Sequence, residues 1–401
     1  MTQRWRVLAL MTTAQAGASV VQQALGSLSP ILVATFAISK AQLGVIFTAL
    51  MFGSATFTAA AGVLTDRFGE RRLVLYSGIA MAMALTAATL VPHYWWLVLC
   101  IFVFGMAYAV STPAGGRAVL AWFDRDRGVA MGIRQTGVPV GGVFGALTLP
   151  YVAHVAGLRG AFLYAAVITL VTTLIAVVPY REGEREAGLS SASILRGMRA
   201  LARDPRMIGV TLTCMVLSGI QQTMNAFITV TAVVLVGTTP ALAALAFACA
   251  QGAAVAGRLG WGFFSDRVLH GERLIPFAII CVLAAGATAT LSTLHGGRVV
   301  PLFVAAAILG FSGAGWNGLM AAALAEVGGA DRAASALGLA LTAIFMASAT
   351  APAAFGAVAD HTSLRVSWLI ASALALLAIA PVLWLRAHLS SAARRSAARA
   401  G

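Results

Sequence analysis

The chain has 401 residues, of which 60% are hydrophobic and 10% are charged, and its mean hydropathy is +0.90. This composition excludes an ordinary soluble globular domain, because too few polar side chains are present to cover its surface. The net charge of +14 and the pI near 11.0 do not predict a nucleic-acid binder, since the basic residues lie scattered between apolar runs rather than on one exposed face.

Apolar runs of roughly 20 residues, the length that crosses a bilayer as a helix, predict an all-α membrane protein with twelve transmembrane helices in two six-helix bundles. The first six spans are expected at 7–36, 42–65, 73–91, 95–120, 128–153 and 160–179. The second six are expected at 207–236, 241–264, 274–294, 300–325, 333–358 and 366–385. The chain therefore divides into an N-terminal bundle at 1–179, a cytoplasmic linker at 180–206, and a C-terminal bundle at 207–401 that ends in a short basic tail.

The distribution of basic residues predicts the orientation of these spans. If both termini lie in the cytoplasm, 20 of the 27 Lys and Arg residues fall on the cytoplasmic side. Lys40, Arg159, Arg298 and Arg365 then lie outside, and Arg117, Arg134 and Arg258 lie within spans. This distribution agrees with the positive-inside rule. We therefore expect a multi-pass protein of the cell inner membrane with both termini in the cytoplasm.

An internal repeat relates the two halves of the chain. The stretch Gly62-Val-Leu-Thr-Asp66-Arg67 recurs as Gly262-Phe-Phe-Ser-Asp266-Arg267, 200 residues later, and each copy closes an apolar span. Six spans are thus followed by six related spans. In transporters built from such repeats, the substrate site lies at the interface of the repeats near the middle of the membrane.

The stretch from Gly62 to Arg72, Gly-Val-Leu-Thr-Asp-Arg-Phe-Gly-Glu-Arg-Arg, resembles the signature loop of the major facilitator superfamily between its second and third helices. The resemblance implies two six-helix bundles, and it implies that this loop is part of a cytoplasmic gate. An acid flanked by arginines at a helix end also favours an ion-pair latch on physical grounds. The residues expected to form the gate are Asp66, Arg67, Gly69, Asp266, Arg267 and Arg117, the last as the partner of Asp66.

Two further stretches are similar to particular branches of this superfamily. The segments 122–132 and 137–141 resemble the junction of the fourth and fifth helices in organic-anion branches, including the monocarboxylate and oxalate/formate transporters. The pair Gly257-Arg258 is similar to the eighth-helix arginine that holds a carboxylate in those branches. The run from Arg134 to Gly137 is also similar to cyanate and nitroimidazole-type carriers.

Arg134 and Arg258 are the strongest candidates for binding a substrate. A charged side chain inside a span costs at least about 2.5 kcal/mol, so it must contact a partner, water or substrate. Neither arginine has a counterpart in the other half, where Ala340 aligns with Arg134 and Thr58 aligns with Arg258. The acidic residues all lie at loops or span ends, and the most interior of them are expected to be Glu326 and Asp360. A guanidinium without an acidic partner favours an anion, and its paired N–H groups suit a carboxylate. The alternative partners of both arginines are carbonyl groups of the helices, or Asp66 and Asp266 at the gate.

Polar residues at helical spacing predict the rest of the lining of the site. On a helix, spacings of three and four residues place side chains on one face. Such residues also bind membrane helices to one another, which is the alternative reading. The candidates are Gln15 and Gln22 in the first span, Tyr108 in the fourth, Gln222 and Asn225 in the seventh, and Asn317 in the tenth.

The predicted function is secondary active transport of a small organic anion, such as a monocarboxylate, by alternating access. Coupling to proton symport or to anion exchange stays open, because no acidic or histidine side chain is expected at mid-membrane; Asp360 is a peripheral acid that could serve. The alternatives are a proton-coupled multidrug efflux pump and a non-transporting nutrient sensor. No catalytic constellation, metal site or cofactor is expected, so the protein is not predicted to be an enzyme. We expect a monomer whose partners are the anion, protons and membrane lipid, with no nucleic acid.

Overall fold

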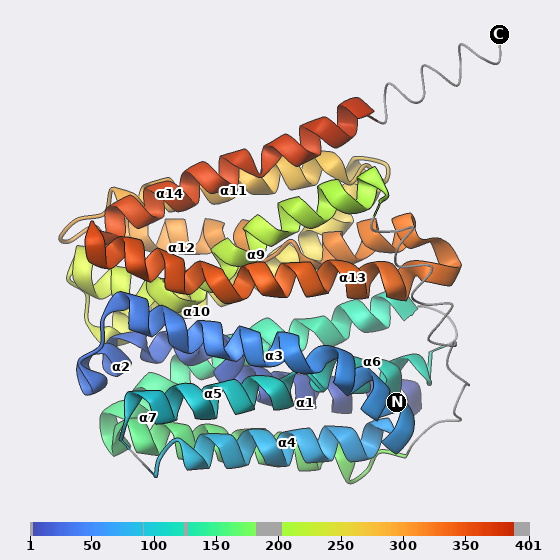
Figure 1. Ribbon diagram of the computed structural model, residues 1–401, viewed down its shortest axis with the longest axis horizontal. Helices are drawn as coiled ribbons and strands as arrows, with labels where there is room; N and C mark the ends of the chain where they lie inside the picture. Colours follow the sequence, from blue (N-terminus) through green and yellow to red (C-terminus); the bar gives the residue numbers. More distant parts are fainter. Residues whose placement is uncertain (1–2, 91, 124–126, 182–202, 389–401) are drawn as a thin grey trace.

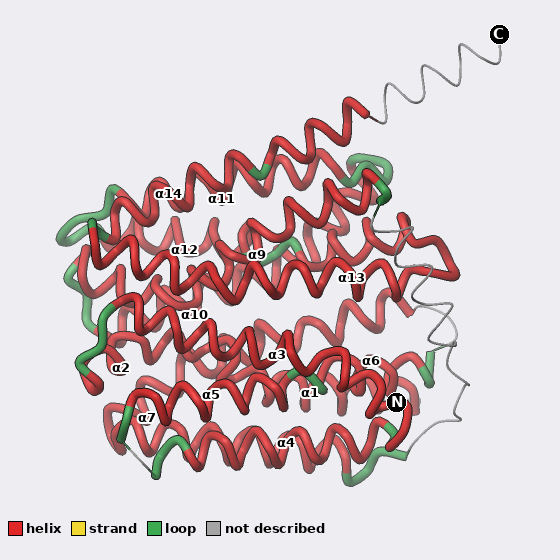
Figure 2. Tube along the Cα trace, viewed as in Figure 1, coloured by secondary structure: helices red, strands yellow, loops and turns green. Residues whose placement is uncertain are grey.

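A computed structural model of the chain describes residues 3–90, 92–123, 127–181 and 203–388. The described residues form helices joined by short loops and contain no strand (Figure 2). The helices run alongside one another, and those of the two halves of the chain form two groups (Figure 1). Most of the predicted linker lies outside the described residues.

The first half contains α1 to α7. Their bounds are Gln3–Ala24 (α1), Leu25–Leu28 (η1), Ser29–Phe36 (α2), Lys40–Phe68 (α3), Glu70–Ala87 (α4), Tyr94–Tyr108 (α5), Ser111–Leu120 (α6) and Arg127–Val177 (α7). The long α7 has a non-helical residue at Gly157, with a φ of 70°, so it holds both of the predicted spans 128–153 and 160–179. Glycine accepts this left-handed backbone without the clash that a Cβ would cause.

The second half contains α9 to α14. Their bounds are Pro205–Thr231 (α9), Ala232–Val236 (η2), Pro240–Phe263 (α10), Phe264–Val268 (η3), Leu274–Ser292 (α11), Val299–Gly313 (α12), Asn317–His361 (α13) and Leu364–Leu377 (α14). Ten stretches of the described residues are long and apolar enough to cross a membrane, and one of them, Ala130–Val177, has 48 residues, enough for two crossings. The predicted span 73–91 falls on α4, which is not among the ten. The all-helical membrane fold is therefore confirmed.

Large apolar side chains cover the outer faces of the bundle. Exposed fractions reach 65% at Met83, 57% at Val167, 53% at Val282 and 57% at Leu369, on α4, α7, α11 and α14. Apolar surface of this extent is unusual on a soluble monomer, whereas it suits contact with lipid tails. These faces are the ones that a surrounding membrane would cover.

Two spans are broken near the same position in each half. In the first half, α5 and α6 are separated at Ala109 and Val110; in the second half, α12 and α13 are separated at residues 314–316. A break in a helix frees backbone carbonyl groups, which membrane proteins tolerate where those groups face the protein interior. These breaks supply acceptors for the charged side chains described below.

The halves meet along two long helix pairs, α3 with α13 and α7 with α10. We call the end where α3 meets α4 and where α9 begins the linker end, and the opposite end, where α2 meets α3 and α13 meets α14, the far end. Near the far end the backbones touch, because a Cβ on Gly44 would lie 2.3 Å from the Pro352 carbonyl oxygen, and one on Gly356 would lie 2.2 Å from that of Lys40. Close contact of this kind needs residues without a side chain. The far end is therefore tightly closed in this structure.

Candidate functional site

Arg134 on α7 is buried in the first half, with an exposed fraction of 1%. Its Nη2 donates to Oε1 of Gln15 at 2.7 Å and to the carbonyl oxygen of Ser111, the residue that follows the break between α5 and α6. Gly115 makes room for the guanidinium, since a Cβ there would lie 2.6 Å from Nη2. Within the described residues, Nε and Nη1 are buried and have no hydrogen-bond partner. The side chain therefore retains two donor nitrogens for a bound group.

Arg258 on α10 reaches the same region from the second half. Its Nη1 donates to the carbonyl oxygen of Gln135 on α7 at 3.1 Å, and its Nε donates to that of Ala314, at the break between α12 and α13, at 3.4 Å. Among the described residues, neither arginine forms an ion pair with an acid. Because Arg258 binds the residue next to Arg134, the two cations converge at the interface of the halves.

Tyr108 lies close enough to both cations for each guanidinium group to act electrostatically on its hydroxyl. Its hydroxyl accepts from Nε2 of Gln15 at 3.1 Å and shares a hydrogen bond of 3.2 Å with Ser19. We call Gln15, Ser19, Tyr108, Arg134 and Arg258 the arginine layer. The layer combines two positive charges with hydroxyl and amide groups, and the carbonyl acceptors of the arginines leave those charges uncompensated. Such a set of donors can bind an anion.

A second polar layer joins the halves nearer to the far end. Nδ2 of Asn225 donates to Oε1 of Gln23 at 2.9 Å and to Oε1 of Gln222 at 3.0 Å. Nε2 of Gln251 donates to Oδ1 of Asn225 at 3.2 Å. We call these four residues, together with Gln22, the amide layer. Gln22 and Gln23 come from α1, and the other three come from the second half. The amide layer therefore closes the path between the arginine layer and the far end.

The structure brings most of the sequence-predicted lining residues together. Gln15 and Tyr108 belong to the arginine layer, whereas Gln22, Gln222 and Asn225 belong to the amide layer. Asn317 donates to the Ala314 carbonyl oxygen at 3.3 Å, the same oxygen that accepts from Arg258. Sequence reasoning missed Gln23 and Gln251. The signal for Gln251 was its position seven residues before Arg258, which places both on one face of α10.

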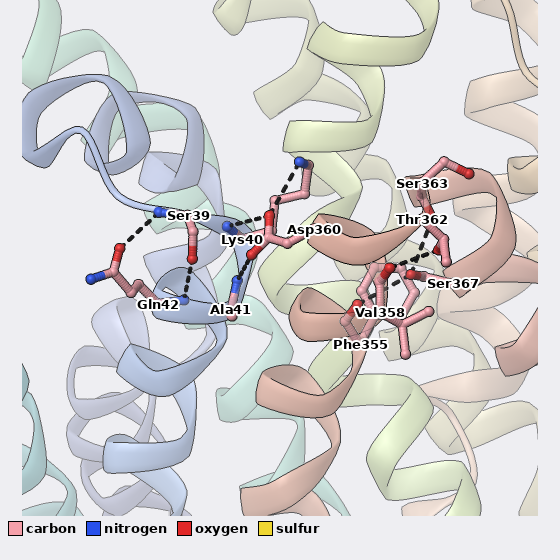
Figure 3. A network of polar contacts seen from close by, with 10 residues as sticks. All are labelled: Ser39, Lys40, Ala41, Gln42, Phe355, Val358, Asp360, Thr362, Ser363 and Ser367. Atoms are coloured by element: carbon pink, nitrogen blue, oxygen red, sulfur yellow. Dashed lines mark hydrogen bonds and ion pairs between the residues drawn. The ribbon is translucent and has the colours of Figure 1, made fainter.

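At the far end, Asp360 on α13 binds the first residues of α3, as Figure 3 shows. One carboxylate oxygen accepts from the backbone N–H of Lys40 at 3.1 Å and from its Nζ at 3.3 Å; the other accepts from the backbone N–H of Ala41 at 2.7 Å. The carboxylate thus satisfies N–H groups at the start of a helix in the other half. We call Lys40, Ala41 and Asp360 the far-end clasp.

The residues predicted to form the gate lie at the linker end. Gly69 joins α3 to α4 with a φ of 86°, a backbone that favours glycine. The Arg67 guanidinium lies 5.3 Å from the centre of the Phe68 ring. Asp266 forms an ion pair of 2.5 Å with Arg273, which also binds Glu326 at 2.5 Å. This pairing lies within the second half, so it does not join the halves, and Arg267 is exposed.

The predicted pair of Asp66 and Arg117 cannot be followed, because the Asp66 side chain lies outside the described residues. Arg117 lies 3.8 Å from the carboxylate of Glu70, which is 4% exposed and accepts from the Tyr180 hydroxyl at 2.8 Å. Glu70 lies at the end of a helix, as expected for the acids, but its side chain is more buried than those of Glu326 and Asp360. Glu70 holds the end of the first half against the start of α4.

Replacement of Glu70 by alanine is expected to lower the stability of the protein by about 1–3 kcal/mol, because a buried charged acceptor of the Tyr180 hydroxyl is lost. Thermal unfolding in detergent measures this loss. Glu70→Gln keeps an acceptor oxygen and should lose less. An equal unfolding temperature for the alanine variant and the original protein would contradict the structural role of Glu70.

Residues 11–300 match the family model described as the Major Facilitator Superfamily, which is more than half of the chain. The chain belongs to this superfamily. It is similar to an uncharacterized MFS-type transporter of Mycobacterium tuberculosis (strain CDC 1551 / Oshkosh), MT3072, with 30% identity over 349 residues that cover 84% of this chain and 76% of the relative. Shorter matches bear the names of a probable anion transporter, a probable sulfoacetate transporter and a multi-drug resistance efflux pump.

The fold is similar to that of a bacterial homologue of the human lysosomal transporter Spinster, solved in an inward-facing and unoccupied conformation. The TM-score is 0.78, the sequence identity is 15%, and the match covers 96% of this chain and 97% of that chain. At this identity the likeness concerns the fold alone. The protein is a multi-pass membrane transporter, and its family performs secondary transport.

Proposed function

We propose that the protein moves a small organic anion, a monocarboxylate or a similar carboxylate, across the cell inner membrane by alternating access. The observation that carries this proposal is the buried guanidinium of Arg134, which retains two donor nitrogens without a partner in the described residues. Leaving buried donors unsatisfied costs about 1–3 kcal/mol each, and more for charged groups. A carboxylate that accepts from one of these nitrogens supplies an acceptor and a counter-charge, and hydrogen bonds between charged groups are roughly twice as strong as neutral ones.

The second cation supports an anion as the substrate and suggests how binding connects the halves. Arg258 comes from the second half and contacts the first half at the Gln135 carbonyl, beside Arg134. An anion between the two guanidinium groups would be attracted to both halves at once. Binding energy that differs between two arrangements of the halves is what shifts a transporter from one to the other. Charged and polar groups at this depth are the usual mark of a substrate pathway.

The contacts between the halves suggest which side is closed. The far-end clasp and the amide layer both lie on the far side of the arginine layer. If the linker end faces the cytoplasm, as the positive-inside rule predicts, this arrangement is closed to the outside. Both termini then lie in the cytoplasm. Coupling by proton symport or by anion exchange is compatible with this scheme.

Ligand-induced thermal stabilisation of the purified protein tests the proposal, because a bound ligand raises the apparent stability by mass action. A panel of small carboxylates, inorganic anions and lipophilic cations is measured with the original protein and with Arg134→Gln. Stabilisation by a carboxylate at 100 times its Kd should amount to about 2.7 kcal/mol and should be lost in the variant. Stabilisation by lipophilic cations alone would overturn the proposal and favour multidrug efflux.

A further inference from the structure

The arginine layer and the amide layer face each other along three helices. On α1, Gln22 follows Gln15 by seven residues; on α10, Gln251 precedes Arg258 by seven residues. On α7, Gly142 follows Arg134 by eight residues, and a Cβ there would lie 3.0 Å from both Gln23 and Gln251. At a rise of 1.5 Å per residue, the two layers are about 10 Å apart on α1 and α10, and Gly142 lies about 12 Å along α7 from Arg134. The three helices therefore give similar separations.

Gln22 differs from the other members of the amide layer. Gln23, Gln222, Asn225 and Gln251 all hydrogen-bond within the layer, whereas the Oε1 atom of Gln22 is buried and has no hydrogen-bond partner in the described residues. The exposed fraction of Gln22 is 6%. A buried acceptor without a donor is costly, which is why nearly all such groups are paired in native proteins. The orphan oxygen therefore needs a donor that the described residues do not supply.

The position of Gln22 relates this oxygen to the site. Gln15, Ser19 and Gln22 are spaced by four and three residues, so they lie on one face of α1. Gln15 binds Arg134, and Ser19 binds Tyr108 one turn further along. Gln22 comes one turn after Ser19, on the side of the amide layer. A ligand held by Arg134 that extends toward the far end along this face of α1 would reach the Gln22 amide.

We propose that the substrate is a carboxylate with a neutral hydrogen-bond donor at its other end, such as a terminal hydroxyl, and that Gln22 accepts from this donor. The inference rests on the proposed function of the arginine layer. Subtracting a hydrogen bond of about 2.8 Å at each end from the separation of about 10 Å leaves about 4.4 Å between a carboxylate oxygen and the hydroxyl oxygen, which a chain of about three carbons spans. The amide layer has no cation, so a second carboxylate would lose its hydration there without gaining a counter-charge.

The hydroxyl should strengthen binding measurably. One neutral hydrogen bond to a buried acceptor contributes about 0.5–1.5 kcal/mol, which corresponds to roughly three- to tenfold in Kd. We therefore expect 3-hydroxypropanoate to bind roughly three- to tenfold more tightly than propanoate. Malonate, which carries a carboxylate at the same position, should bind more weakly than the hydroxy acid.

Binding of these three acids to the full-length protein, to Gln22→Met and to Arg134→Gln tests the inference. Gln22→Met keeps the length of the side chain but removes its acceptor oxygen, so it should bind propanoate as the original protein does and lose the preference for 3-hydroxypropanoate. Unchanged propanoate binding also shows that this variant is folded. Arg134→Gln should bind none of the acids.

The outcomes separate this inference from the proposed function. If propanoate binds but the hydroxyl adds no affinity, or if Gln22→Met keeps the preference for the hydroxy acid, the role of Gln22 is excluded and the anion site stands. Tighter binding of malonate than of 3-hydroxypropanoate also excludes a neutral donor at the Gln22 end of the substrate. If none of the acids stabilises the original protein, the proposed function fails together with the inference.

Discussion

Replacement of Arg258 by alanine is expected to abolish transport while the protein still inserts and folds. In the structure its guanidinium contacts the first half at the Gln135 carbonyl and the break in its own half at Ala314. The truncation removes one of the two cations and the charged contact that comes from the second half. Charged hydrogen bonds contribute about 1.5–3 kcal/mol, so the loss corresponds to roughly 10- to 100-fold weaker binding of the anion.

Uptake of the stabilising carboxylate into proteoliposomes measures this effect. Arg365→Ala is a matched control, because Arg365 also donates from its guanidinium to a distant backbone carbonyl, that of Leu294 in the loop after α11, at 3.2 Å, but lies at the far end and away from the site. The control should transport at the original rate. Arg258→Lys keeps the charge without the planar pair of N–H groups, so an intermediate rate is expected. Full uptake by Arg258→Ala would exclude Arg258 from the substrate site.

The fold could be predicted from the sequence because membrane spans are set by length and apolar content. The sequence could not give the breaks at Ala109 and at residues 314–316, since helix propensity alone would continue both spans. These breaks depend on tertiary contacts, among them the hydrogen bonds from Arg134 and Arg258 to the freed carbonyl groups. The internal repeat predicted that the two halves correspond. It did not predict that the interrupted helices of both halves would supply carbonyl acceptors to Arg134 and Arg258, which have no counterpart in the repeat.

The two arginines were found from the sequence because an ionisable group inside an apolar run is visible without a structure. Their acceptors and the far-end clasp were not. Helical spacing tells which residues share a face, as for Gln15, Ser19 and Gln22, but not which residue of the other half lies opposite. The contacts of Asn225 with Gln23, and of Asp360 with α3, join positions about 200 and 320 residues apart, and only the docking of the halves decides them.

Replacement of Asp360 by asparagine is expected to open the far end. The ionised carboxylate accepts from two backbone N–H groups and one ammonium group at the start of α3, whereas an amide offers a single oxygen and no charge. The clasp is partly solvated, since 24% of the Asp360 side chain is exposed, so the loss lies toward the low end for charged hydrogen bonds. We expect roughly a tenfold shift of the equilibrium toward a state open at the far end.

The rate of modification of Thr48→Cys by a membrane-impermeant maleimide measures this shift. The Thr48 hydroxyl binds the Ala349 carbonyl across the interface of the halves, so a cysteine there is partly covered at this interface while the far end is closed. The four natural cysteines are replaced by serine in every protein compared. Labelling should be roughly tenfold faster in the Asp360→Asn protein, because a hydrogen-bond loss of about 1.4 kcal/mol changes an equilibrium tenfold.

Asp204→Asn is the matched control for this comparison. The Asp204 carboxylate also accepts from a backbone N–H at the start of a helix, that of Arg206 at 2.7 Å, but both residues belong to the second half. The same chemical change should therefore leave the labelling rate as it was. Equal rates in the two variants would mean that the clasp does not hold the far end closed. The far end would then be held closed by the backbone contacts at Gly44 and Gly356. Replacing either glycine by alanine would separate α3 from α13, whereas the change of charge at Asp360 would not.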